Sequence, residues 1–405
     1  MSDSFSSGNT GSSAQGDCFV TLTLKESGGI TLDIQSKVGD LFGKSIRDLC
    51  LDMMEYYGIP DAHLTIEDQG ALPFTLRARL EAAVRKAFPD SKPFGVMDHS
   101  GAFHPQEKDR FRRSRLYLPG NNPKLMINAG LYAADGIILD LEDSVAPSRK
   151  DEARILVRNA LHELDFGSSE RMIRINPFPA GILDLETLIP ERVNCVLIPK
   201  CESREDVIRV DLKIKEITSE SGIDHPVYLM PIVESAKGIW AAKEIAEACD
   251  TVVALAIGLE DLTADLGTRR TDEGDESFVA RSLLVLAARA AGIQAIDSVF
   301  SDVSDMDALK KTALESKKMG FDGMGCIHPR QIPIIHDAFA PTSSETEKAQ
   351  AIVMAYEDAE KKGLGVVSLG SKMIDAPVLK RALKTIRLAE TLNRIPKNWR
   401  ETYGK

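Results

Sequence analysis

The sequence lacks the features of a membrane, secreted or nucleic-acid-binding protein. It contains no apolar run long enough to span a bilayer, and its first residues show neither the basic start nor the apolar segment of a signal peptide. The six cysteines are scattered without a C-x-x-C pair, which argues against zinc motifs and a disulfide framework. No basic run stands out, and the net charge is −11. We therefore expect a cytoplasmic protein with reduced cysteines and neither a membrane nor a nucleic-acid partner.

Composition divides the chain of 405 residues into a small module and a larger remainder. Residues 1–17 are rich in Ser, Gly and Asn and predict a flexible N-terminus. Residues 18–88 predict a small α+β module, in which Cys18–Leu24 and Ile30–Ile34 alternate apolar and polar residues around a Gly-Gly turn, the pattern of a hairpin. Residues 89–111 contain three prolines and no periodicity, which is typical of a linker.

From residue 112 onward, short apolar segments alternate with amphipathic ones. Near-continuous apolar strands separated by helices are typical of a parallel sheet that is covered on both faces. Eight such units in roughly 220 residues predict a (β/α)₈ TIM barrel over residues 112–340, with a helical region over 341–405. The predicted strands are Arg115–Pro119, Gly136–Asp140, Met172–Ile175, Cys195–Pro199, Val227–Ile232, Val252–Ile257, Gln294–Val299 and Gly323–Ile327.

Polar side chains follow most of the predicted strands. In a (β/α)₈ barrel the working residues lie just beyond the C-terminal ends of the strands, so these side chains are the candidates for the site. They are Asp140, Glu142, Asp143, Arg174, Asn176, Lys200, Glu234, Asp261 and His328, with Asp297 inside the seventh strand.

Glu234 and Asp261 follow adjacent strands, so their carboxylates can converge on one cation. Oxygen ligands without a nearby cluster of Cys or His favour Mg²⁺ over zinc. Mg²⁺ commonly takes only one or two protein carboxylates, which leaves positions for a substrate. Ion pairs with Arg or Lys in the mouth of the barrel would use the same carboxylates, and both interpretations stay open at this point.

Arg174 ends the third predicted strand, where its guanidinium can grip a carboxylate with two bonds or stabilise a developing enolate. An ion pair with Asp140, Glu142 or Asp143 is the alternative, and the two roles are compatible. Lys200 raises the rival mechanism of a Schiff-base aldolase. A lysine after a strand is more often an ion-pair or phosphate partner, and we expect that role.

Two loops complete the set of candidates. Pro119-Gly-Asn-Asn-Pro is a turn after the first strand, whose backbone N–H groups can hold a phosphate while Asn121 bonds a nucleotide portion. His328 precedes a proline and could act as a base, but we expect a structural hydrogen bond.

Seven motifs in order resemble the citrate lyase beta-subunit and malyl-CoA and citramalyl-CoA lyase family (HpcH/HpaI aldolase-like) from about residue 112 to 390. Any one motif would be unspecific, whereas the joint match is highly specific. The motifs are Arg113-Ser-Arg-Leu-Tyr-Leu-Pro-Gly-Asn-Asn-Pro, Ile138-Leu-Asp-Leu-Glu-Asp-Ser-Val-Ala, Arg174-Ile-Asn, Pro199-Lys, Val233-Glu-Ser-Ala-Lys-Gly, Gly258-Leu-Glu-Asp-Leu and Cys326-Ile-His-Pro-Arg-Gln-Ile.

The resemblance implies a role for individual residues. Glu234 and Asp261 match the Mg²⁺ ligands, and Arg174 matches the arginine that faces the keto acid. Met373-Ile-Asp-Ala-Pro resembles a C-terminal lid motif whose aspartate reaches into a neighbouring subunit's site, which makes Asp375 the candidate acid/base and implies a homotrimer or higher homo-oligomer. Without the resemblance, Asp375 reads as a helix N-cap before Pro377. The residues implied to bind substrate or CoA are Pro119, Asn121, Lys124, Asp140, Glu142, Asp143 and Lys200.

The first module is similar to the citrate lyase acyl carrier (gamma) subunit. The resemblance lies in Thr65-Ile-Glu-Asp-Gln-Gly-Ala-Leu-Pro-Phe-Thr-Leu-Arg-Ala-Arg-Leu-Glu-Ala-Ala. That family attaches a CoA-derived prosthetic group to a serine, but the aligned position here is Gln15. Ser12 and Ser13 lie nearby and fit only with a gap, so a carrier role depends on them.

The expected activity is a Mg²⁺-dependent carbon–carbon lyase that cleaves a 3-hydroxyacyl-CoA into acetyl-CoA and a 2-keto acid. The candidate substrates are citramalyl-CoA, malyl-CoA and citryl-CoA, which give pyruvate, glyoxylate and oxaloacetate. The main alternative is a fused beta–gamma component of a citrate lyase complex that needs an alpha subunit and acts on a carrier-bound citryl thioester. An acyl-CoA thioesterase and a non-catalytic assembly module are further alternatives.

Overall fold

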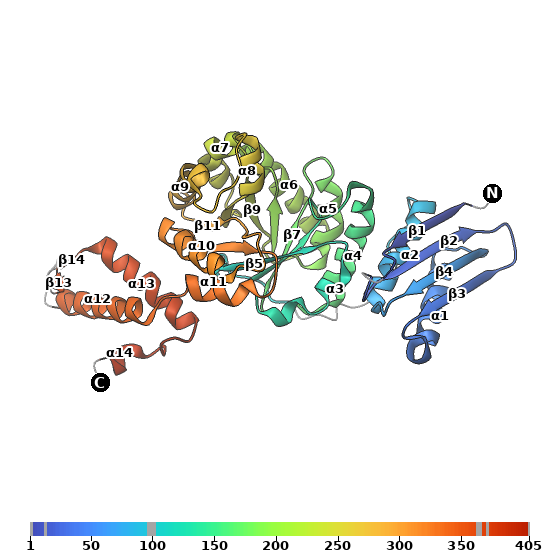
Figure 1. The fold of residues 1–405 in the computed structure, drawn as a ribbon, viewed down its shortest axis with the longest axis horizontal. Coiled ribbons are helices and arrows are strands. Elements are labelled where there is room, and N and C mark those ends of the chain that lie inside the picture. Colours follow the sequence, from blue (N-terminus) through green and yellow to red (C-terminus); the bar gives the residue numbers. More distant parts are fainter. Residues whose placement is uncertain (1–2, 12–13, 95–102, 362–366, 370–371, 404–405) are drawn as a thin grey trace. The chain divides into compact units, whose positions relative to one another are not determined.

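The computed structural model describes residues 3–11, 14–94, 103–361, 367–369 and 372–403. The chain forms two compact units, Met1–Ile335 and His336–Lys405 (Figure 1). The first unit contains a small sheet with two helices and a closed barrel, and the second unit is mainly helical.

The small sheet has four strands in the order β1-β2-β4-β3. Alternate residues of its central strands are buried, and both helices contribute to the same apolar core. Burial on one face explains the alternation of apolar and polar residues in the sequence. The elements are β1 (Ser4–Gly8), β2 (Cys18–Leu24), β3 (Ile30–Ser36), α1 (Gly39–Tyr56), β4 (Ala62–Asp68) and α2 (Pro73–Ala87).

Two predictions for this sheet were wrong. Residues 4–8, predicted to be flexible, form β1 because they pair antiparallel with β2 through the backbone, a contact that needs no apolar side chains. The predicted hairpin is absent, because β4 lies between β2 and β3 and pairs with both. Ser12 and Ser13 lie outside the described residues, and the domain boundaries stay a prediction.

The barrel is closed and entirely parallel, with the strand order β10-β11-β12-β5-β6-β7-β8-β9, which confirms the predicted fold class. All eight predicted strands are present with ends within two residues of those expected. The strands are β5 (Ser114–Pro119), β6 (Gly136–Asp140), β7 (Glu170–Arg174), β8 (Cys195–Ile198), β9 (Tyr228–Val233), β10 (Ala254–Ile257), β11 (Gln294–Asp297) and β12 (Gly323–Cys326).

Helices surround the barrel strands (Figure 1). They are α3 (Pro123–Met126), α4 (Lys150–Glu163), α5 (Gly181–Leu188), α6 (Arg204–Glu220), α7 (Ala236–Ala246), α8 (Leu259–Asp265), α9 (Asp275–Ala290), α10 (Met306–Met319) and α11 (Gln331–Phe339), with short 3₁₀ turns at Ala129–Tyr132, Pro147–Arg149 and Ile189–Glu191. Apolar side chains that include Met172, Leu197 and Met230 fill the barrel interior. The interior is therefore packed, as in other barrels of this kind, and the C-terminal ends of the strands carry the polar residues.

The second unit consists of α12 (Ser343–Lys361), β13 (Val367–Leu369), β14 (Lys372–Ile374), α13 (Ala376–Thr391) and α14 (Trp399–Thr402). A small core that includes Val353, Ile386 and Trp399 holds its helices together. Asp375 is exposed and caps α13, because its carboxylate accepts a hydrogen bond from the Val378 N–H at 3.0 Å. Across the described parts of both units, no helix is long and apolar enough to cross a membrane.

The small module packs against the barrel through α2 and α4, and the contact contains a buried ion pair. Glu81 on α2 is fully buried and accepts two hydrogen bonds from Arg158 on α4, at 2.8 and 2.7 Å. Arg85, whose side chain is 30% exposed, contacts the same carboxylate at 3.0 Å.

Arg158→Met is expected to lower the free energy of unfolding by about 3 kcal/mol, because it leaves Glu81 buried without its main partner. Arg85→Met is the matched control and should cost less than about 1 kcal/mol, because its ion pair is partly exposed. Urea unfolding measures both values. Equal losses in the two variants would contradict the assignment of Arg158 as the main partner.

Candidate active site

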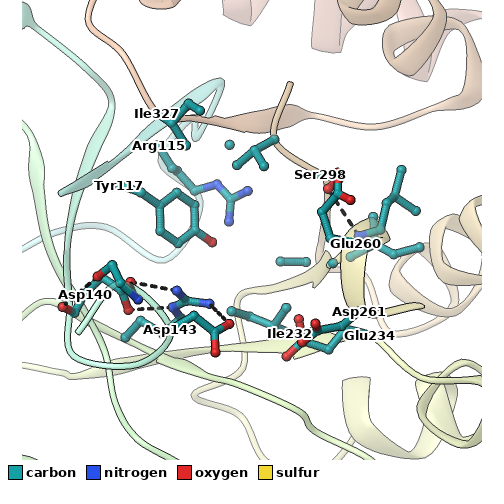
Figure 2. Close-up of a pocket in the computed structure, with 18 of the residues that line it drawn as sticks. Arg115, Tyr117, Asp140, Asp143, Ile232, Glu234, Glu260, Asp261, Ser298 and Ile327 are labelled. Atoms are coloured by element: carbon teal, nitrogen blue, oxygen red, sulfur yellow. Dashed lines mark hydrogen bonds and ion pairs between the residues drawn. The ribbon is translucent and has the colours of Figure 1, made fainter. Parts of the chain in front are cut away.

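A pocket of about 530 Å³ lies at the C-terminal ends of the barrel strands. Its lining includes residues that end or follow β5, β6, β7, β9, β10 and β11 (Figure 2). Of the residues predicted from the sequence, the pocket is lined by Pro119, Asp140, Asp143, Arg174, Glu234, Asp261 and Asp297.

Glu234 and Asp261 lie next to each other on one side of the pocket (Figure 2). Glu234 follows β9, is only 7% exposed and accepts a hydrogen bond from the Lys200 backbone N–H at 2.7 Å. Gly258 precedes α8 and leaves room for this carboxylate, because a Cβ atom there would lie 2.3 Å from the Glu234 Oε2. The glycine therefore permits the close approach of the two loops that carry Glu234 and Asp261.

The two carboxylates are poorly compensated. Burial raises the pKa of Glu234 to about 7. The hydrogen bond from the Lys200 backbone N–H lowers this pKa, whereas the negative charge of Asp261 raises it. The Asp261 Oδ2 is buried and accepts no hydrogen bond, and it lies 3.6 Å from the Lys200 Nζ. Lys200 is thus the only cation of the described residues that pairs with Asp261, whose side chain is 44% exposed, and a bound cation would supply the contact that the buried oxygen lacks.

This donor set fits Mg²⁺, which takes oxygen ligands and keeps several positions for water or substrate. Across the described residues, no group of three or more His, Cys, Asp and Glu side chains is arranged to hold a metal. Two carboxylates are within the number that Mg²⁺ uses when a substrate completes its coordination.

Arg174 forms ion pairs with the carboxylates that end or follow β6, as one of its two predicted roles required. It lies beside Asp140 in the register of β6 and β7, and it donates to both Asp140 oxygens at 2.6 and 2.7 Å. Its Nη1 lies 2.8 Å from the Glu142 Oε2 and 3.5 Å from Asp143. Although burial alone would lower the pKa of Arg174, the bonds to Asp140 raise it above its usual value. The Nε and Nη2 donors of Arg174 are thus occupied by Asp140, so Asp140 would have to move before the guanidinium could bind a substrate carboxylate with the same two bonds.

Lys200 is a cation held among carboxylates, as expected. Its Nζ lies 2.5 Å from the Glu142 Oε1 and 3.3 Å from Asp143. Burial opposes the charge, but the hydrogen bond to Glu142 and the nearby carboxylates raise the pKa of Lys200 above its usual value. A lysine that stays protonated is a poor nucleophile, which argues against the Schiff-base mechanism.

The remaining predicted residues lie outside the pocket lining. The Asn121 backbone carbonyl accepts a hydrogen bond from the buried Arg79 of the small module at 3.0 Å, and Lys124 is exposed on α3. The His328 Nδ1 accepts a hydrogen bond from the Arg330 N–H at 3.1 Å, the structural role that was expected. Asp375 belongs to the second unit.

Sequence reasoning missed Arg115 and Tyr117, which line the pocket from β5. The sequence pattern places both in the first predicted strand and singles out neither. The signal was available, because an arginine at an inward position of a buried strand needs a partner inside the barrel.

Comparisons with known proteins agree with this geometry. The family described as HpcH/HpaI aldolase/citrate lyase matches residues 113–329, and the one described as malonate decarboxylase delta subunit (MdcD) matches residues 6–87. Citrate lyase subunit beta from Haemophilus influenzae is 41% identical over 285 residues, which are 70% of this chain and 98% of that subunit. Mitochondrial citramalyl-CoA lyase from Homo sapiens is 33% identical over 293 residues, which are 69% of this chain and 86% of that enzyme.

A solved structure is similar as well. Protein CitE from Mycobacterium tuberculosis, in complex with magnesium, acetoacetate and coenzyme A, superposes with a TM-score of 0.58 at 32% identity. The match covers 70% of this chain and 99% of that protein.

Proposed function

The chain belongs to the HpcH/HpaI aldolase/citrate lyase family and is a carbon–carbon lyase of the citrate lyase beta type, and we propose that it cleaves a free 3-hydroxyacyl-CoA with Mg²⁺ as cofactor. The products are acetyl-CoA and a 2-keto acid, from citramalyl-CoA, malyl-CoA or citryl-CoA. The observation that carries this proposal is the pair of undercompensated carboxylates, Glu234 and Asp261, inside a pocket large enough for a small acyl group.

Glu234 and Asp261 would hold the Mg²⁺. When bound, the ion would supply Lewis-acid polarisation of the substrate's hydroxyl and neighbouring carboxylate oxygens. The relative from Mycobacterium tuberculosis, whose complex contains magnesium and coenzyme A, supports this choice of ion and of thioester.

Arg174 and Lys200 supply fixed positive charge beside the reacting group. Arg174 stabilises the enolate oxygen through the N–H that its carboxylate partners leave free. Asp140, Glu142 and Asp143 position the two cations, and Asp140 and Asp143 also line the pocket. Because these bonds exist before substrate binds, little reorganisation accompanies the reaction.

In the cleavage step the hydroxyl proton passes to a water molecule, the O–H electron pair forms the C=O bond of the keto acid, and the carbon–carbon bond breaks with its electron pair left on the thioester enolate. We assign the protonation of the enolate carbon to Asp375 of a neighbouring subunit, which acts as a general acid and, in the condensing direction, as a base. A lid that carries this residue would exclude water and protect the enolate. The proposed assembly is a homotrimer or a higher homo-oligomer.

The CoA portion is assigned to the turn after β5, with Pro119 at the pocket and Asn121 and Lys124 beyond it. Pro119 lines the pocket and Lys124 is exposed, so together they outline a path from the acyl group towards solvent. A lysine at the outer end suits a phosphate as a point charge.

A second candidate is a beta–gamma component of a citrate lyase complex with an alpha subunit. The match of residues 6–87 to a carrier-type family supports it. It requires a CoA-derived prosthetic group on Ser12 or Ser13, because the position aligned with the attachment serine is Gln15.

The test is a cleavage assay with the purified chain, Mg²⁺ and each of the three free CoA esters, without any other protein. The proposal expects keto acid from at least one ester. No product from any ester would contradict it, and a mass increase on Ser12 or Ser13 would then favour the carrier-bound alternative. Free CoA without keto acid would indicate a thioesterase, and a chain that binds neither Mg²⁺ nor an ester would indicate an assembly module.

A further inference from the structure

Arg115 is a fully buried cation whose side chain points into the pocket from β5 (Figure 2). Its hydrogen bonds within the protein are poor. The Nη1 lies 2.8 Å from the Met230 sulfur, the Nη2 lies 3.4 Å from the Asp297 carbonyl oxygen, and the Nε is buried without a partner. Most of the guanidinium donors therefore remain available to a ligand.

No carboxylate of the described residues forms an ion pair with Arg115. The carboxylate of Asp297, which also lines the pocket, is held by Arg281 at 2.5 Å. Two other arginines are equally buried, and each grips a carboxylate with two bonds: Arg79 holds Asp17, and Arg112 holds Glu170. Arg115 lacks such a carboxylate and lines the pocket, so a ligand's anion can pair with its charge there.

Glycines lie beside this side chain on both neighbouring strands. Arg115 pairs in register with Gly136 on β6 and with Gly325 on β12, so neither neighbouring strand contributes a side chain at that level. A Cβ atom on Gly325 would lie 2.6 Å from a Val299 methyl group and 3.2 Å from the Tyr117 ring. Val299 and Tyr117 fill the room beside Gly325, and Met172 fills the room beside Gly136, so a ligand reaches Arg115 through the pocket that this arginine lines.

The position of Arg115 near the start of β5 indicates which part of the substrate can reach it. Pro119, where β5 ends, is four residues farther along the same strand, which separates the two Cα atoms by about 13 Å at the rise of a strand. The CoA phosphates, assigned to the turn beyond Pro119, are therefore too far away. Only the acyl group enters this deep, and the anionic group that an acyl chain carries is a carboxylate, which suits the guanidinium fork.

We propose that Arg115 binds a second carboxylate of the acyl group, so that the substrate carries a carboxylate on the side chain of the hydroxyl carbon and the product is a dicarboxylic keto acid. The inference rests on the proposed function, in which the first carboxylate lies beside the hydroxyl group at Glu234 and Asp261. Among the three candidate substrates it selects citryl-CoA, because citramalyl-CoA has a methyl group and malyl-CoA a hydrogen at the same position.

The test compares kcat/KM for the three esters in the wild type and in Arg115→Met. The wild type should prefer citryl-CoA, and the variant should lose about 100-fold or more with that ester while changing less than about threefold with the other two. Arg115→Lys should keep part of the preference. The variant should fold, because replacing an unpaired buried charge with an apolar side chain is not destabilising.

Arg171→Met is the matched control. Arg171 is also buried and pairs with no carboxylate of the described residues, since it donates to the carbonyl oxygens of Leu161 and Glu191. It lies outside the pocket lining, so any loss should be equal for the three esters. Equal losses in Arg115→Met would overturn the inference and assign Arg115 to the carboxylate that all three esters share. No change in Arg115→Met would overturn it as well.

A binding measurement separates this inference from the proposed function. In thermal-shift titrations with Mg²⁺ present, oxaloacetate should stabilise the wild type at lower concentration than pyruvate, and Arg115→Met should abolish the difference. If this preference is present without turnover of any ester, the proposed function fails and the inference stands. If esters are cleaved but oxaloacetate and pyruvate bind alike, the inference fails and the proposed function stands.

Discussion

Asp375→Asn is expected to lower kcat about 10³-fold while leaving Mg²⁺ binding and the KM for the thioester nearly unchanged. The amide cannot transfer the proton to the enolate carbon. It does keep the cap of α13, because an asparagine oxygen accepts the Val378 N–H as the carboxylate does. The loss is therefore chemical rather than structural, and steady-state kinetics together with a Mg²⁺ titration measures it.

Asp305→Asn provides the matched control, because Asp305 caps α10 through the same type of bond, to the Ala308 N–H at 2.9 Å. It should retain full activity. Mixing inactive Asp375→Asn and Glu234→Gln subunits should restore part of the activity if Asp375 acts on a neighbouring subunit's site. Full activity in Asp375→Asn alone would refute the assignment, and mixtures without restored activity would refute the neighbouring-subunit arrangement.

Glu234→Gln is expected to reduce kcat/KM by more than about 100-fold and to make the residual rate insensitive to added Mg²⁺. The neutral amide removes one of the two charges proposed to hold the ion. The variant should also unfold at no lower temperature in the absence of Mg²⁺, because the native carboxylate is buried and its pKa is raised to about 7.

Glu260→Gln is the control for this change. Glu260 lines the same pocket and precedes Asp261, but its side chain is 63% exposed and pairs with Arg270 at 2.8 Å. Its replacement should alter kcat/KM less than about threefold. If both glutamine variants lost activity equally, general pocket charge rather than metal ligation would explain the effect of Glu234.

The barrel was largely predictable because each buried parallel strand is a short apolar segment, and eight such segments recur along the sequence. Its topology then places the residues after those strands on one face, which is why Glu234 and Asp261 could be paired before their positions were known. β1 was missed because its residues, Ser-Phe-Ser-Ser-Gly, carry almost no apolar pattern, and only its pairing with β2 makes it a strand.

The state of the arginines was not predictable, because it depends on which carboxylate each one reaches. The register of β6 and β7 places Asp140 beside Arg174 and fills its fork. Asp297 lines the same pocket as Arg115, but its carboxylate accepts a hydrogen bond from Arg281 on α9 instead. Composition and spacing are the same whichever pair forms, so only the folded structure shows that no carboxylate of the described residues pairs with Arg115.

Mg²⁺-dependent carbon–carbon cleavage is measured most directly by the product balance of the purified chain with and without Mg²⁺. The esters to use are citryl-CoA, citramalyl-CoA and malyl-CoA, with EDTA added and then overcome by excess Mg²⁺. A Mg²⁺-dependent lyase should form keto acid and acetyl-CoA in equal amounts, lose both products when EDTA is added and regain both with excess Mg²⁺. Cleavage that persists in EDTA, or free CoA released without keto acid, would contradict this activity.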